Sequence, residues 1–97
     1  MAWDSETELI FILIIMKGDI IKVERPGLVV IGIEKEIYNN NISFSQYLYC
    51  GELYFRSGYT TATIVPITEE ERNDFKRRLL EKGYTYDEET KELIYEI

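Results

Sequence analysis

Hydrophobic and polar positions along this 97-residue chain alternate in short runs until a helical pattern appears near residue 70. Apolar runs separated by Gly, Pro and Asn at roughly 8–12-residue intervals are typical of a small barrel or a strongly curled antiparallel sheet. We therefore expect five to six strands, within the runs 9–16, 20–23, 28–33, 42–49, 53–55 and 59–65.

Three features of these runs carry specific expectations. The apolar run Leu9–Met16 is too short for a membrane span, which needs about 20 residues, and its acidic flank does not fit a secretory signal. We expect it to be a strand buried on both faces, in a cytoplasmic protein, with residues 1–8 either a loose tail or a first edge strand. Period-two alternation over 42–49 predicts a strand with its even-numbered residues buried. Gly32 predicts a bulge or bend.

One helix is expected over residues 68–82. Thr68 followed three residues later by Glu71 is a capping box, and Gly83 supplies the left-handed residue that ends a helix. The apolar stripe is narrow, which indicates a helix lying on a surface. It consists of Phe75, Leu79 and Leu80.

The chain ends in a pattern typical of a β-hairpin. Residues 84–86 and 91–97 are rich in strand-forming side chains and flank the acidic loop 87–90. With no linker or repeat elsewhere, the sequence predicts a single α+β domain over 1–97, built from a curled sheet or SH3-like barrel, one helix and a terminal hairpin.

Composition narrows the chemistry. The chain has 11 basic and 18 acidic residues, so its net charge of −7 opposes binding to duplex nucleic acid. It has no histidine, no paired cysteines and no glycine-rich phosphate loop. We expect Cys50 to be buried on a strand. The sequence predicts no enzyme, no cofactor and no metal site.

The candidate binding residues are aromatic and basic. Tyrosine occurs eight times, and on strands it either packs as ordinary structure or forms a binding face that can stack a nucleobase. Arg56 lies between the aromatic strands and is a natural anchor for phosphate or carboxylate. The basic row on the helix is either a solvated face or a phosphate-binding patch. The candidates are Tyr47, Tyr49, Tyr54, Arg56, Tyr59, Arg72 and Lys76.

The acidic clusters 69–71 and 87–89 lie at the expected helix start and in the hairpin loop. Capping and solvation explain them, and an ion or partner site is the alternative. Asp74 and Arg78 are spaced for an ordinary salt bridge.

Two segments carry a family resemblance. The turn Lys17-Gly18-Asp19 and the C-terminal third resemble a group of small, mostly uncharacterised phage and prophage proteins of gut bacteria. The matching C-terminal residues are Ile67 to Glu71, Phe75, Leu79, Gly83, Tyr84, Tyr86 and Asp87 to Leu93. The resemblance implies a phage-associated accessory role and carries no known activity or site residues.

Three functions are compatible with these observations. The first is a non-enzymatic modulator that binds and inhibits a host protein, through an acidic, tyrosine-rich surface. The second is a sponge for a nucleotide signal, and the third is a virion assembly protein. A homodimer is compatible with each of them.

Overall fold

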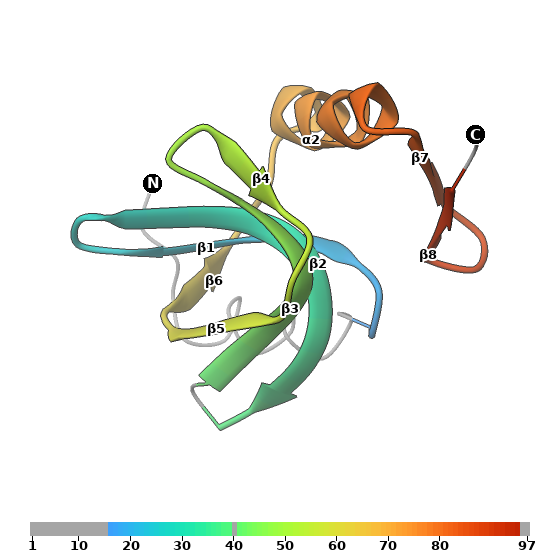
Figure 1. The fold of residues 1–97 in the computed structure, drawn as a ribbon. Coiled ribbons are helices and arrows are strands. Elements are labelled where there is room, and N and C mark those ends of the chain that lie inside the picture. Colours follow the sequence, from blue (N-terminus) through green and yellow to red (C-terminus); the bar gives the residue numbers. More distant parts are fainter. Residues whose placement is uncertain (1–15, 40, 96–97) are drawn as a thin grey trace.

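The fold is seen in a computed structural model that describes residues 16–39 and 41–95, and in that part of the chain it is α+β (Figure 1). The predicted tail and the predicted strand up to residue 15 lie outside the described residues. The strands are β1 (Ile20–Arg25), β2 (Leu28–Tyr38), β3 (Asn41–Tyr49), β4 (Glu52–Tyr54), β5 (Gly58–Thr61), β6 (Thr63–Val65), β7 (Tyr84–Asp87) and β8 (Glu92–Tyr95), and the helix is α2 (Glu69–Glu81).

Six of the strands form one antiparallel sheet in the order β4-β3-β2-β1-β6, while β5 pairs with the first half of β3. The segment 58–65 is therefore paired with β3 at one end and with β1 at the other. This pairing confirms the predicted curled antiparallel sheet. The sheet is not closed, because β5 and β6 are short and follow one another along the chain, separated by Ala62, with no ladder between them.

Apolar side chains lie on both faces of this sheet, because neighbouring residues of a strand point in opposite directions. One buried cluster lies between the sheet and α2 and comprises Ile20, Ile31, Ile33, Phe75, Leu79 and Tyr86. The other lies within the curl and comprises Ile21, Val23, Val30, Ile42, Phe44 and Ile64. The curl and the helix are thus held by two separate hydrophobic clusters.

A double irregularity interrupts the β2–β3 ladder. Ile33 pairs with Gln46, but the next pairs are Glu34 with Phe44 and Glu36 with Ser43. Lys35 and Ser45 are left without an opposing residue, as in β-bulges. The predicted irregularity at Gly32 is therefore displaced, and lies just beyond Ile33.

The bulge at Ser45 changes which side chains of β3 are buried together. Phe44 lies inside the curl, whereas Leu48 packs against the helix-side cluster and Tyr47 packs inside the curl. The prediction that even-numbered residues share one buried face is therefore wrong beyond Phe44. One inserted residue reverses the alternation.

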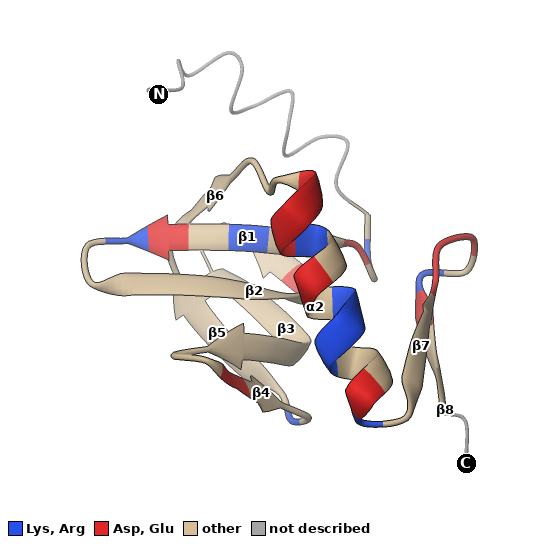
Figure 2. Ribbon diagram, turned by 90° about the horizontal axis from the view of Figure 1, so that it is seen from above, with Lys and Arg blue, Asp and Glu red and all other residues tan. Residues whose placement is uncertain are grey.

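The helix begins as predicted. The Glu71 amide donates to the Thr68 hydroxyl oxygen at 3.0 Å, and the Thr68 amide donates to the Glu71 carboxylate at 3.1 Å, which confirms the capping box. Figure 2 shows α2 crossing over β1 and β2. Phe75 and Leu79 are fully buried, but Leu80 is 60% exposed, so its place in the buried stripe was wrong. Leu80 lies about 100° around the helix from Leu79 and points away from the sheet.

The C-terminal strands β7 and β8 pair antiparallel in a separate two-stranded sheet, from Tyr84–Tyr95 to Asp87–Glu92. The Asp87 carboxylate accepts hydrogen bonds from the amides of Glu89 and Thr90, at 2.8 and 3.0 Å. The predicted hairpin is thus confirmed in part over the described residues 84–95: the two strands pair, but the loop is 88–91 and not the predicted 87–90.

Cys50 does not lie on a strand. It is exposed and forms, with Gly51, the two-residue turn between β3 and β4. Both residues have positive φ, 52° and 79°, as a type I′ hairpin turn requires. The predicted burial of Cys50 was wrong because Cys50 is the first residue of the turn that follows β3, where the backbone leaves the sheet.

Candidate binding surfaces

The structure separates the seven predicted binding residues into two groups. Tyr47, Tyr49, Tyr54, Arg56 and Tyr59 lie on and around β3, β4 and β5, whereas Arg72 and Lys76 lie on α2. The two groups form different surfaces.

The side chains of Tyr47, Tyr54 and Arg56 form one ordered unit, here called the aromatic–arginine cluster. The two rings stack with centroids 5.0 Å apart and planes 20° apart. The Arg56 guanidinium lies 5.0 Å from the centroid of the Tyr54 ring and donates from Nε to the Tyr47 hydroxyl at 3.3 Å. This contact raises the pKa of Arg56, so the guanidinium stays charged.

Glycine at position 58 makes room for this cluster. A Cβ atom there would lie 2.5 Å from Cε1 of the Tyr47 ring, which is closer than carbon atoms approach. A side chain at position 58 would therefore displace the Tyr47 ring, which contacts both Tyr54 and Arg56.

A groove of about 270 Å³ lies beside the cluster and is here called the aromatic groove. Its residues come from β1, β2, β3 and β5. They are Arg25, Leu28, Val30, Phe44, Tyr47, Tyr49, Gly58, Tyr59 and Thr60. Tyr59 is 83% exposed and Arg25 is exposed at the end of β1. Among the described residues, Arg25 has no ion-pair partner, so a cation at the rim is available to a ligand.

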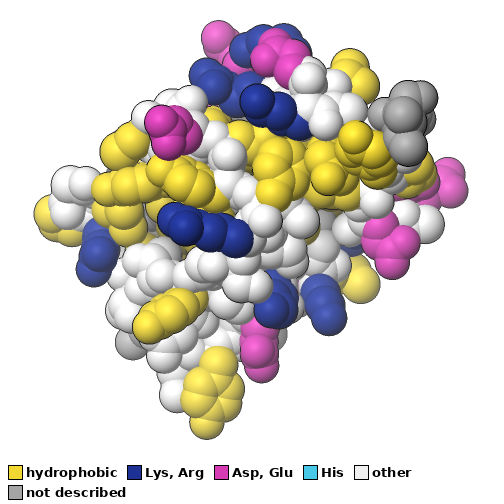
Figure 3. All heavy atoms as spheres, in the orientation of Figure 1, with side chains coloured by type: hydrophobic (Ala, Val, Ile, Leu, Met, Phe, Trp, Pro, Cys, Tyr) yellow, Lys and Arg dark blue, Asp and Glu magenta, His cyan; other side chains and the backbone are white. Residues whose placement is uncertain are grey.

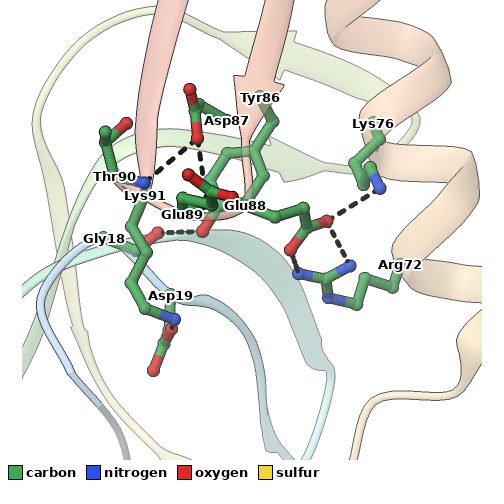
Figure 4. Close-up of polar contacts among 10 residues, drawn as sticks. All are labelled: Gly18, Asp19, Arg72, Lys76, Tyr86, Asp87, Glu88, Glu89, Thr90 and Lys91. Atoms are coloured by element: carbon green, nitrogen blue, oxygen red, sulfur yellow. Dashed lines mark hydrogen bonds and ion pairs between the residues drawn. The ribbon is translucent and has the colours of Figure 1, made fainter.

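Arg72 and Lys76, the two predicted binding residues on α2, are already paired with an acidic side chain. Arg72 makes a two-pronged contact with the Glu88 carboxylate, at 2.7 and 2.5 Å, and Lys76 donates to the same carboxylate at 2.8 Å (Figure 4). The hydrogen bonds from Arg72 and then Lys76 lower the pKa of Glu88 to about 2. These two cations thus tie α2 to the hairpin loop, where Arg72 also lies 5.9 Å from the centroid of the Tyr86 ring, and they line no part of the aromatic groove. Asp74 also pairs with Arg78, at 2.9 Å, as expected.

The sequence did not predict a set of contacts that joins the two ends of the described chain, the turn before β1 and the C-terminal hairpin. The Tyr86 hydroxyl donates to the Gly18 carbonyl at 2.6 Å, and Lys91 forms an ion pair with Asp19 (Figure 4). Burial raises the pKa of Tyr86 to about 12, so the hydroxyl remains a donor. No periodicity signals such contacts, because they join residues about 70 positions apart.

A second groove, of about 550 Å³, lies between the β2–β3 bulge and the hairpin. Glu34 lines it and is only 5% exposed. Burial, then the nearby Asp19 carboxylate, raises the pKa of Glu34. In the sequence, the position of Glu34 directly after the apolar run 28–33 was the feature that could have indicated a buried carboxylate.

Apolar side chains also gather at the surface below α2, where Figure 3 shows them as a yellow band. Phe55 stacks on Tyr84, and Tyr84 meets Tyr95 edge-on, each pair with ring centroids 4.8 Å apart. These rings connect the segment after β4 to the hairpin.

The described residues contain no group of three or more His, Cys, Asp or Glu side chains arranged to hold a metal ion. Within the same part of the chain, no helix is long and apolar enough to cross a bilayer. No family model, no curated protein and no solved structure matches this chain.

Proposed function

We propose that this chain is a non-enzymatic binding protein that docks a partner protein through the aromatic groove and the adjoining aromatic–arginine cluster. The observation that carries the proposal is the ordered stack of Tyr47, Tyr54 and Arg56 beside the exposed Tyr59. Tyrosine and arginine are the residues most enriched at the energetic centres of protein interfaces.

Preorganisation supports this function. Arg56 is held by a ring and a hydroxyl group, and Tyr47 is held between Tyr54 and the backbone of Gly58. Side chains that are already fixed lose little entropy on binding, so more of the contact energy appears as affinity.

The size of the groove favours a protein side chain over a free nucleotide. At about 270 Å³ it is slightly smaller than the roughly 300–1,000 Å³ of sites that enclose small ligands. A partner that inserts one side chain and covers the surrounding tyrosines fits this shape.

The charge of this surface differs from that of the whole chain. Residues 16–67 contain five basic and five acidic side chains, so the excess of acid lies elsewhere. Near the groove, Arg25 and Arg56 offer positive charge, which suits a partner segment carrying carboxylates. The surface proposed here is therefore an aromatic face with two arginines, on which the Glu52 carboxylate accepts a hydrogen bond from the Tyr54 hydroxyl at 3.0 Å.

The biological setting follows from the resemblance to phage proteins. In that setting the chain acts in the host cytoplasm as a phage-encoded modulator that inhibits a host defence or nucleic-acid-handling protein. We further infer that the curled sheet is a scaffold of the SH3-like barrel type, with its binding face on β3 and β5.

Affinity capture from host lysate tests the proposal. The bait is the full chain, compared with a double variant, R25A with Y59A, and with Tyr95→Ala as a control for loss of an exposed tyrosine elsewhere. We expect one protein to be retained by the wild type and by the control and lost by the double variant. Equal retention by all three baits, or no retained protein, rejects the proposal.

A thermal-shift panel of linear and cyclic nucleotides tests the alternative function, in which the chain sequesters a nucleotide signal. A ligand at 100 times its Kd stabilises a protein by about 2.7 kcal/mol, which is readily measured. We expect no shift. A shift that disappears in Arg56→Ala would favour nucleotide binding at the same tyrosines.

A further inference from the structure

The groove beneath the hairpin has walls from three distant parts of the chain. The β2–β3 bulge contributes Ile33, Glu34, Ser45 and Gln46, the turn before β1 contributes Lys17 and Gly18, and the hairpin contributes residues 90–93. The contacts of Tyr86 with Gly18 and of Lys91 with Asp19 hold these walls together. The groove is therefore part of the folded structure and independent of the aromatic groove.

The bulge explains why a carboxylate lies in this groove. Where an extra residue is inserted, two consecutive side chains can point to the same side of a strand. Ile33 and Glu34 both line the groove, and so do Ser45 and Gln46 across from them. An apolar floor and a set of oxygen acceptors are thereby placed side by side.

The Glu34 carboxylate has no partner among the described residues. No described side chain or amide donates to it, although the residue is 95% buried, being 5% exposed. Every fully enclosed side-chain oxygen in the described structure has a hydrogen-bond partner. Because the Glu34 oxygens have none, they must be in contact with solvent, and a ligand in the groove can reach them. A desolvated carboxylate gains more than an exposed one from a cationic partner.

Charged groups face Glu34 from each surrounding element. Lys17 and Asp19 lie before β1, Glu36 lies on β2, and Lys91 and Glu92 lie on the hairpin. Asp19 and Lys91 neutralise each other as an ion pair. Among the groups that line the groove, Glu34 and Glu92 then outweigh Lys17, which leaves a site that attracts a cation.

We propose that this groove binds a guanidinium group, which pairs with the Glu34 carboxylate and is held by the oxygen acceptors of Ser45, Gln46 and Thr90. A guanidinium presents five donors in a plane, and it is more weakly hydrated than an ammonium group. Both properties suit a groove that combines several acceptors with the apolar side chains of Ile33 and Leu93.

Binding depends on pH through Glu34. The cation needs the ionised carboxylate, and the pKa of Glu34 is raised by burial. Affinity is therefore highest above that raised pKa and falls as the pH is lowered through it.

Nuclear magnetic resonance titration of the full chain tests the site with two probes. N-ethylguanidinium represents a free small ligand, and acetyl-Gly-Arg-Gly-amide represents an arginine side chain of a protein. Acetyl-Gly-Lys-Gly-amide is the ammonium control. We expect shifts confined to the amides of Glu34, Gln46, Thr90 and their neighbours, with weaker binding of the lysine peptide. Tighter binding of ethylguanidinium indicates a free ligand, and tighter binding of the arginine peptide indicates a protein segment.

Two glutamine variants complete the test. Glu34→Gln should weaken binding about tenfold or more, because a charge-assisted pair is lost, while Glu52→Gln, at an exposed position on β4 that does not line the groove, should leave it unchanged. The proposal is overturned if neither guanidinium probe shifts the groove amides of the wild type. It is also overturned if both variants bind as the wild type does.

Discussion

The hydroxyl group of Tyr86 and the carbonyl group of Gly18 form a 2.6 Å hydrogen bond across 68 positions of sequence. This bond fastens the C-terminal hairpin to the turn that precedes β1. Lys91 and Asp19 add an ion pair beside it. The Lys-Gly-Asp turn and the acidic hairpin are thus in direct contact.

Loss of this bond should be measurable. Tyr86→Phe keeps the ring in the helix-side cluster but leaves a buried carbonyl without its donor. We expect a loss of about 1–3 kcal/mol in the free energy of unfolding by denaturant. Tyr38→Phe, at a 69% exposed position, should change stability by less than about 0.5 kcal/mol. Equal effects of the two changes would argue against the bond.

Glycine at position 18 is required for two reasons that a matched variant can separate. Gly18 and Gly27 both have positive φ, 93° and 78°, so alanine strains either turn. Of these two positions, Gly18 is the one where an added Cβ would meet the backbone, 2.5 Å from the Lys91 carbonyl oxygen. We expect Gly18→Ala to be more destabilising than Gly27→Ala by about 1–3 kcal/mol in thermal or chemical unfolding. Similar losses would mean that the hairpin does not press against Gly18.

Glu34 should make stability fall as the pH rises. Its raised pKa means that the folded chain holds this proton to a higher pH than the unfolded chain does. Its contribution is therefore fully present below the ordinary value of 4.5 and is lost as the pH rises through the folded pKa. Glu34→Gln, which cannot ionise, should be more stable than the wild type at pH 7 by on the order of 1 kcal/mol.

Chemical unfolding at pH 4 and pH 7 measures this difference. The advantage of the glutamine variant should be smaller at pH 4. If it grows on acidification, the carboxylate is stabilised in its charged form and the assignment is wrong.

Glu88 should have the opposite effect and make stability fall as the pH is lowered. Its pKa is lowered to about 2 by Arg72 and Lys76, so its contribution is present above 4.5 and is lost as the pH falls towards 2. The side chain is 49% exposed, so the effect should be under about 1 kcal/mol. We expect Glu88→Gln to lower stability at pH 7 and to match the wild type near pH 2. A constant difference at both pH values would rule out the ion pairs as its cause.

Local signals predicted the local elements of this fold. The capping box at Thr68 and Glu71 and the antiparallel pairing of the two terminal strands follow from interactions between residues a few positions apart. Such interactions are encoded in short windows of sequence, and there the predictions were confirmed.

Errors arose where distant strands decided the outcome. The bulge at Ser45 depends on the pairing of β2 with β3, and it moved Leu48 to the helix side. The exposure of Leu80 depends on where α2 lies against the sheet. The pairing of Arg72 with Glu88 likewise joins residues 16 positions apart, which the basic row on the helix does not reveal.

Site-specific photo-crosslinking tests the proposed docking face most directly. A benzophenone amino acid replaces Tyr59 in one sample and Tyr95 in another, and each full chain is irradiated in host lysate. Both positions are exposed, at 83% and 56%, but only Tyr59 lines the aromatic groove. We expect one defined protein adduct from position 59 and none from position 95. An adduct from position 95 alone, or from neither position, would contradict binding through the tyrosine and arginine face.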